Sequence, residues 1–120
     1  MAPVGEAAIT GGGKLAARHV VHVVGPVWHR GRRGEAELLE AAYRSAIELA
    51  DEHGLVSIAF PSISTGVFGY PVQLAAPVAL EAIRQALIAA SNVRLVEIVL
   101  LDENSLEVWV DTAKDIEEAE

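Results

Sequence analysis

One stretch of the sequence gathers most of the residues that could bind an anionic ligand. It reads Phe60-Pro-Ser-Ile-Ser-Thr-Gly-Val-Phe-Gly-Tyr-Pro71 and joins an apolar segment typical of a strand to one typical of a helix. Its glycines allow positive φ angles and a close approach of the backbone to a ligand. Consecutive backbone amides that lead into a helix N-terminus suit a phosphate group. On spacing alone, an ordinary strand-to-helix turn is the favoured alternative.

Other polar or glycine-rich groups in the chain favour structural roles. His19 and His22 are three positions apart in a run of strand formers, so they face opposite sides and do not suit one metal site. The turn at residues 30–34 carries three arginines, and a solvated loop is favoured over contact with an anionic ligand or partner. The triple glycine at residues 11–13 lacks the flanking strand and helix of a phosphate loop. Since the chain also has no cysteine, we expect neither a metal site nor a cofactor.

Length and composition narrow the class of protein. A chain of 120 residues with 52% hydrophobic residues forms one domain with a core of its own. Its formal net charge of −8, with only nine Lys and Arg, argues against nucleic acid as a partner. The N-terminus lacks a signal-peptide pattern and no apolar run has the length of a membrane span, so we expect a cytoplasmic protein without a membrane contact.

Hydrophobic periodicity predicts seven elements in the order strand, strand, helix, strand, helix, strand, helix. The last helix is expected to be capped by Asn104 or Ser105, and Trp109 is expected to anchor it in the core. Alternating strands and helices indicate an α/β layered sheet, in which ligands lie beyond the carboxyl ends of the strands. The expected strands span residues 6–10, 19–25, 56–60 and 95–101, and the expected helices span residues 35–53, 72–90 and a C-terminal segment.

Three motifs in the same order resemble the macro domain. They are Gly-Glu-Ala-Ala-Ile-Thr at residues 5–10, Leu-Ala-Ala-Arg-His-Val-Val-His-Val-Val-Gly-Pro at residues 15–26, and Ala-Phe-Pro-Ser-Ile-Ser-Thr-Gly-Val-Phe-Gly-Tyr-Pro at residues 59–71. The resemblance continues through Val-Leu-Leu-Asp-Glu at residues 99–103. It implies that residues 1–120 form a single macro-like domain equivalent to the C-terminal two-thirds of the family domain. The implied fold is α/β, a three-layer α/β/α mixed sheet of about four strands with three helices.

The resemblance also implies a ligand site for ADP-ribose or for an ADP-ribosylated protein. Phe68 would lie beside the distal ribose, and backbone amides of residues 64–68 would bind the phosphates. Asp102 and Asn104 would lie near the adenine, where Leu101 replaces an aromatic residue of many relatives. The implied ligand-binding residues are Ser62, Ser64, Thr65, Gly66, Val67, Phe68, Gly69, Tyr70, Asp102 and Asn104.

The family's N-terminal part has no counterpart in this sequence, and the resemblance therefore assigns no catalytic residue. In the family's sheet, a strand of that part lies between the counterparts of residues 20–25 and 57–60. Its absence would leave unpaired backbone groups and apolar side chains at two strand edges. Direct pairing of the two strands and a homodimer that covers the gap are the favoured solutions. A separately supplied half is the third.

Three functions follow from the resemblance. The favoured one is an ADP-ribose-binding module that uses residues 62–70. The second is a hydrolase of ADP-ribosyl esters or of ADP-ribose 1″-phosphate, although amides alone supply no general base. The third is a degenerate domain that binds no ligand and mediates oligomerisation. Whether the chain is an enzyme stays open at this point.

Overall fold

The structure, a computed structural model, describes residues 4–11, 19–66 and 68–119. The order of the elements is the predicted one, and most of their ends agree within a few residues. The strands are β1 (Ala7–Gly11), β2 (His19–Val23), β3 (Ser57–Phe60) and β4 (Leu95–Ile98), and the helices are α1 (Glu35–Glu52), α2 (Val72–Ala89) and α3 (Glu103–Ala119).

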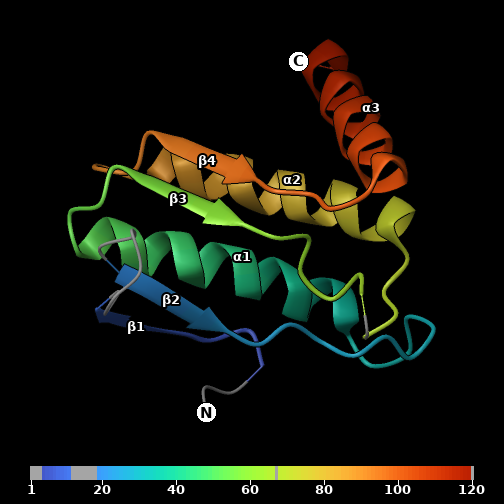
Figure 1. Cartoon of the computed structure of the whole chain (residues 1–120), viewed down its shortest axis with the longest axis horizontal. Helices are drawn as coiled ribbons and strands as arrows, with labels where there is room; N and C mark the ends of the chain where they lie inside the picture. Colours follow the sequence, from blue (N-terminus) through green and yellow to red (C-terminus); the bar gives the residue numbers. More distant parts are fainter. Residues whose placement is uncertain (1–3, 12–18, 67, 120) are drawn as a thin grey trace.

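The four strands form two separate sheets, which lie side by side in Figure 1. β1 pairs with β2 in antiparallel orientation, with Ala7 opposite Val23. β3 pairs with β4 in parallel orientation, with Ser57 opposite Leu95. No described residue bridges β2 and β3, so the hypothesis that these two strands pair directly is wrong. The reason lies in α1, which contacts β1, β2 and β3 and occupies the space behind the gap, so each sheet rests on its own side of the helix.

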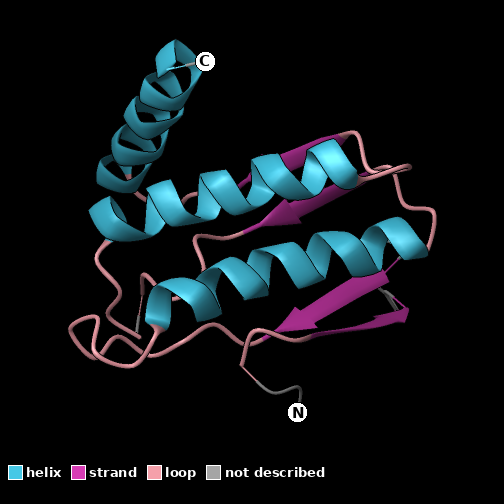
Figure 2. Ribbon diagram, turned by 180° about the vertical axis from the view of Figure 1, so that it is seen from behind, coloured by secondary structure: helices cyan, strands magenta, loops and turns pink. Residues whose placement is uncertain are grey.

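The α/β class and the three helices are confirmed, but the layers differ from the prediction. Figure 2 shows α1 and α2 lying together across one face of the two sheets, with α3 projecting beside the start of α2. Among the described residues, no helix covers the opposite face of the strands. The arrangement is therefore two layers with α3 at the edge, where three layers were expected.

Small side chains let the two long helices pack closely. α2 presents a face of alanines to α1, and the central residue on the α1 side is Tyr43, which is 1% exposed. Its ring contacts Phe60 and Trp109, and Trp109 is 5% exposed, which confirms its role as the core anchor of α3. The buried residues of these helices are Leu39, Ala42, Tyr43, Ala46, Ile47, Ala50, Ala75, Ala76, Ala79, Ala82, Ile83, Ala86 and Trp109.

α2 lies where the sequence predicted it, within one residue at its end, and it is long and apolar. It begins at Val72, contains Pro77 at an exposed position, and within the described chain is the one helix whose length and composition would allow it to cross a membrane. The expectation that no segment has that length is thereby corrected. Since its alanine face is buried against α1 and it also contacts α3, it serves as a core helix here.

Candidate functional site

The loop at residues 62–70 connects the carboxyl end of β3 to the start of α2 and folds into a compact turn. Ser64 takes the left-handed conformation, with φ of 67°, and Gly69 does so with φ of 76°. The amide of Tyr70 donates to the carbonyl of Ser64 at 2.9 Å, and the amide of Gly69 donates to the carbonyl of Gly66 at 3.0 Å. These two hydrogen bonds close the loop on itself.

The tip of the loop keeps several backbone donors available. Among the described residues, the amides of Ser64, Thr65 and Gly66 have no hydrogen-bond acceptor. The Oγ of Ser64 is buried and likewise finds no partner in the described part of the chain. Buried polar groups are normally hydrogen-bonded, so an unsatisfied hydroxyl next to free amides indicates a place for a hydrogen-bonding ligand. Successive amides of this kind suit the oxygens of a phosphate.

Gly25, just after β2, lies against this loop. A Cβ atom on Gly25 would overlap the Oγ of Ser64 and the Cγ2 of Ile63. Only glycine allows the two backbones to approach so closely. The contact joins the carboxyl ends of β2 and β3, although the strands themselves are unpaired. The sequence pattern gave no sign of this role for Gly25.

Two aromatic side chains hold the start of the loop from the core side. The hydroxyl of Tyr43 accepts the amide of Ile63 at 2.9 Å and donates to the carbonyl of Pro61 at 3.4 Å. Burial raises the pKa of Tyr43, so the phenol stays protonated. The indole of Trp109 donates to the Oγ of Ser62 at 3.2 Å, and Ser62 also accepts from the hydroxyl of Thr65 at 2.9 Å. The hydrogen bond between the side chains of Ser62 and Thr65 thus stabilises the loop from within.

Trp28 supports the other end of the loop. Its amide donates to the carbonyl of Phe68 at 2.9 Å, and its ring lies 4.6 Å from the ring of Tyr70. Tyr70 is 3% exposed and belongs to the core, whereas Phe68 is 39% exposed at the surface. Phe68 is therefore accessible at the surface, and Tyr70 lies beneath the loop.

The turn that follows Trp28 is organised by a buried carboxylate. Glu35 is 1% exposed and accepts the amides of His29 at 2.8 Å, Gly31 at 2.9 Å and Arg33 at 2.6 Å. Burial acts to raise the pKa of Glu35, but these backbone hydrogen bonds outweigh it and lower the pKa to about 2. The sequence alone did not reveal that Glu35 organises this turn.

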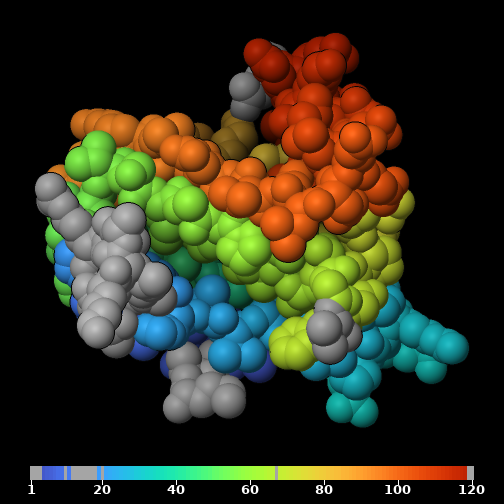
Figure 3. All heavy atoms as spheres, in the orientation of Figure 1, coloured from blue at the N-terminus to red at the C-terminus, as the bar shows by residue number. Residues whose placement is uncertain are grey.

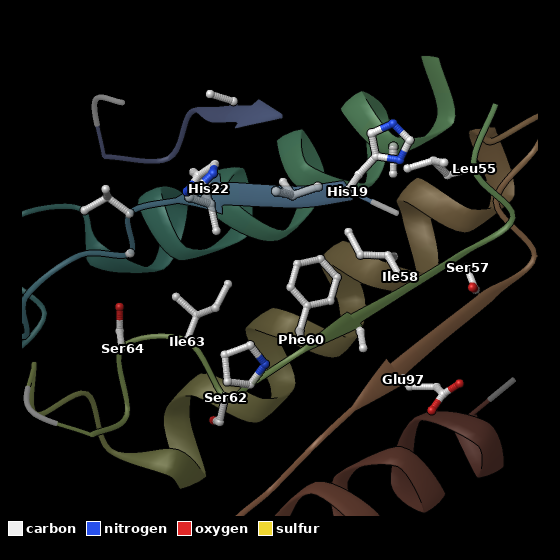
Figure 4. Close-up of a pocket in the computed structure, with 18 of the residues that line it drawn as sticks. His19, His22, Leu55, Ser57, Ile58, Phe60, Ser62, Ile63, Ser64 and Glu97 are labelled. Atoms are coloured by element: carbon white, nitrogen blue, oxygen red, sulfur yellow. The ribbon is translucent and has the colours of Figure 1, made fainter. Parts of the chain in front are cut away.

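A groove of about 1520 Å³ lies between the two sheets and extends to the loop at residues 62–70. Figure 4 shows Ser62, Ile63 and Ser64 at one end, with Phe60 and Ile58 of β3 on one side and His19 and His22 of β2 on the other. Its lining is mainly apolar, with the hydroxyls of Ser62 and Ser64 at the loop end and a few polar side chains along the strands. Such a groove has room for an extended ligand with an anionic group seated on the loop. The residues that line the groove include Val21, Val23, Ile58, Phe60, Ser64 and Phe68.

Of the predicted site residues, Ser62, Ser64 and Phe68 line this groove, whereas Thr65, Gly66, Gly69 and Tyr70 belong to the adjoining loop without lining it. Val67 lies outside the described residues. Asp102 and Asn104 are exposed near the start of α3 and do not line the groove. Asp102 caps α3, because its Oδ1 accepts the amide of Ser105 at 2.7 Å, so the cap is neither Asn104 nor Ser105 as expected. Leu101 is 97% exposed, since β4 already ends at Ile98. The loop residues Ser62, Ser64, Thr65, Gly66, Phe68, Gly69 and Tyr70 do lie together.

His19 and His22 both line the groove, but they do not form a metal site with other side chains. In the described part of the chain, no group of three or more His, Cys, Asp or Glu residues could hold a metal ion. The chemistry that the groove offers is therefore hydrogen bonding from amides and hydroxyls, next to an apolar wall.

Comparison with known proteins decides the family. The family model described as Macro domain matches residues 1–79, which is more than half of the chain. The chain belongs to the Macro domain family. Across 107 residues it is 48% identical to a macro domain-containing protein of Cupriavidus necator and 40% identical to an O-acetyl-ADP-ribose deacetylase of Pantoea vagans, in both cases over 89% of this chain. The predicted recognition of this family is confirmed.

Solved macro domains have the same fold. The Oceanobacillus iheyensis macrodomain with ADP superposes with a TM-score of 0.92 at 42% identity, over 98% of this chain. The Trypanosoma brucei macrodomain in complex with ADP-ribose superposes with a TM-score of 0.83 at 34% identity, over 92% of this chain. The chain spans 62% of the Cupriavidus protein, 62% of the Oceanobacillus chain and 46% of the Trypanosoma chain. The matched portion therefore includes the loop at residues 62–70 but corresponds to only part of each relative.

Proposed function

We propose that this macro domain binds ADP-ribose, free or attached to a protein, with the diphosphate on the loop at residues 62–70. The observation that carries the proposal is a set of donors at the loop tip that have no acceptor among the described residues, namely the amides of Ser64, Thr65 and Gly66 and the hydroxyl of Ser64. The groove beside the loop has room for the rest of the nucleotide. Solved macro domains in complexes with ADP-ribose and with ADP support the choice of ligand.

Titration calorimetry with ADP-ribose tests the proposal. We expect measurable heat for the wild-type chain and a loss of about tenfold or more in affinity for Gly66→Glu, because the new carboxylate would repel the diphosphate at the loop tip. Gly11→Glu is the matched control, since no atom of the described residues lies within 4 Å of a Cβ on either glycine and both changes add one negative charge. No heat and no thermal shift at millimolar ADP-ribose would contradict the proposal.

Hydrolysis of ADP-ribosyl groups is the second candidate, and the deacetylase names of the Pantoea and Enterobacter relatives favour it. Catalysis needs a group that activates water. Among the described groove residues, the titratable side chains are His19, His22 and Glu97. Release of ADP-ribose from an ester substrate, abolished in Gly66→Glu and retained in Gly11→Glu, would support a hydrolase. Stable binding without release would favour a binding module.

We also propose a homodimer that covers the gap between the sheets. Its formation can be tested independently of ligand binding. The facing edges of β2 and β3 are unpaired in the described structure, and a second copy could supply backbone partners for them. Light scattering with and without ADP-ribose distinguishes the two. A dimer that binds no ADP-ribose would favour the third reading, an oligomerisation domain.

A further inference from the structure

The turn at residues 30–33, here called the arginine turn, displays three guanidinium groups. Arg30, Arg32 and Arg33 are all exposed. The ion pairs seen in the described structure involve Arg44 and Arg84, and no acidic side chain there pairs with the arginine turn. The chain has a net charge of −8 and 17 acidic residues, so three neighbouring arginines without an acidic partner among the described residues call for an explanation.

The backbone of the arginine turn is fixed from inside. The buried carboxylate of Glu35 accepts two amides of the turn, those of Gly31 and Arg33, and the amide of His29 just before it. The amide of Arg32 donates to the carbonyl of His29 at 3.2 Å. Arg30 and Gly31 both adopt left-handed conformations, with φ of 59° and 77°. A fixed backbone lowers the entropy that the side chains lose when they bind a partner, because only the side chains remain to be ordered.

The arginine turn is joined directly to the proposed ADP-ribose loop. Trp28 hydrogen-bonds to Phe68 and stacks on Tyr70, and a Cβ on Gly31 would lie 3.6 Å from the ring of Trp28. Figure 3 shows the arginine turn projecting from the surface beside the yellow-green atoms of the loop. The guanidiniums therefore lie at the surface beside the loop on which we propose that the ligand binds.

We propose that the arginine turn binds the carboxylates of acidic residues that flank an ADP-ribosylated side chain on a protein. The inference rests on the proposed function, since ADP-ribose must first occupy the loop. Guanidinium groups bind carboxylates in a planar, bidentate manner. A short acidic peptide segment can contact the three arginines alone. A nucleic acid is longer, and its remaining phosphates would lie over the acidic surface of the rest of the chain and be repelled. Charges farther than about 8 Å are screened at physiological salt, so the local arginines decide the interaction.

Calorimetry with two synthetic peptides tests this inference. Each peptide carries one ADP-ribosylated serine, flanked by glutamates in the first and by glutamines in the second. We expect wild-type protein to bind the glutamate peptide about tenfold more tightly, as a few exposed ion pairs would provide. The combined change Arg30→Gln, Arg32→Gln and Arg33→Gln should remove this preference and leave the affinity for free ADP-ribose within about twofold.

A matched variant controls for overall charge. Arg44→Gln, Arg84→Gln and Arg94→Gln together remove the same charge from other parts of the surface and should keep the preference for glutamate. Equal affinities of wild-type protein for the two peptides, with free ADP-ribose still bound, would overturn this inference alone. No binding of free ADP-ribose would overturn the proposed function as well. A single-stranded RNA that competes with the glutamate peptide more strongly than unmodified glutamate peptide does would assign the turn to nucleic acid instead.

Discussion

The phenol of Tyr43, in the middle of α1, accepts the backbone amide of Ile63 at 2.9 Å, in the loop that we propose as the phosphate site. The same hydroxyl donates to the carbonyl of Pro61. One core side chain thus satisfies two backbone groups at the point where β3 turns into the loop. The position of the loop depends on α1 as much as on its own sequence.

Tyr43→Phe should destabilise the protein and weaken ADP-ribose binding. The change leaves the amide of Ile63 buried without its acceptor, which costs about 1–3 kcal/mol in the free energy of unfolding. Urea denaturation and calorimetry measure the two effects. Tyr70→Phe is the matched control, because the hydroxyl of Tyr70 makes no hydrogen bond with the described residues. Equal stability of the two variants would show that the hydroxyl of Tyr43 does not support the loop.

Gly25→Ala should displace the loop at residues 62–70. The new methyl group would overlap Ser64 and Ile63, and overpacking of this kind costs about 1–3 kcal/mol in the free energy of unfolding. We also expect a lower affinity for ADP-ribose, because the free amides follow directly after Ile63. Gly11→Ala has open space around the new methyl group and serves as the control in thermal unfolding. A fully stable Gly25→Ala protein with unchanged affinity would mean that the loop has room to move.

Glu35 should make stability depend on acid pH. Its pKa is lowered from 4.5 to about 2 in the folded protein. The stabilisation is therefore complete above the ordinary pKa and is lost as the pH falls from there through about 2. Glu35→Gln should be less stable than wild type at neutral pH, and the difference should shrink across that acid range. Glu37→Gln, on the exposed side of the same first turn, controls for the helix dipole. A pH-independent difference would contradict the role of the charge.

The facing edges of β2 and β3 should exchange their amide hydrogens quickly in a monomer. Successive amides in a strand point to opposite sides, so each of these strands has some amides bonded to its partner strand and others directed into the groove. Hydrogen exchange at low protein concentration should therefore alternate along β2 and β3. Uniform protection that disappears on dilution would favour the homodimer.

The sequence predicted the elements well because their signals are local. The apolar stripe of α1 and the strand formers of β2 depend only on neighbouring residues, and both elements lie where the periodicity placed them. The separation of β2 from β3 was not predictable in this way, since strand pairing is set by contacts distant in sequence.

In the candidate site, too, the features with a local sequence signal were predictable and those that depend on the fold were not. The loop at residues 62–70 stood out by its glycines and small polar residues, whereas Gly25 and Tyr43 reach it only through the fold. Glu35 is recognisable in the sequence as an acidic residue at a helix start. Such a residue is expected there whether its side chain faces solvent or accepts hydrogen bonds from a neighbouring turn. The cap of α3 at Asp102 was missed by two or three positions, because Asp, Asn and Ser are nearly equivalent at that position.

The division of the sheet also bears on how the chain folds. β1 and β2 are successive strands joined by a short connection, whereas β3 and β4 are joined through the whole of α2, so only the first sheet is built from segments near one another in sequence. Local contacts of this kind shorten the search for the native state. The two units should behave as separate cooperative folding units that α1 brings together, and α1 is the element whose docking commits the whole chain to its structure.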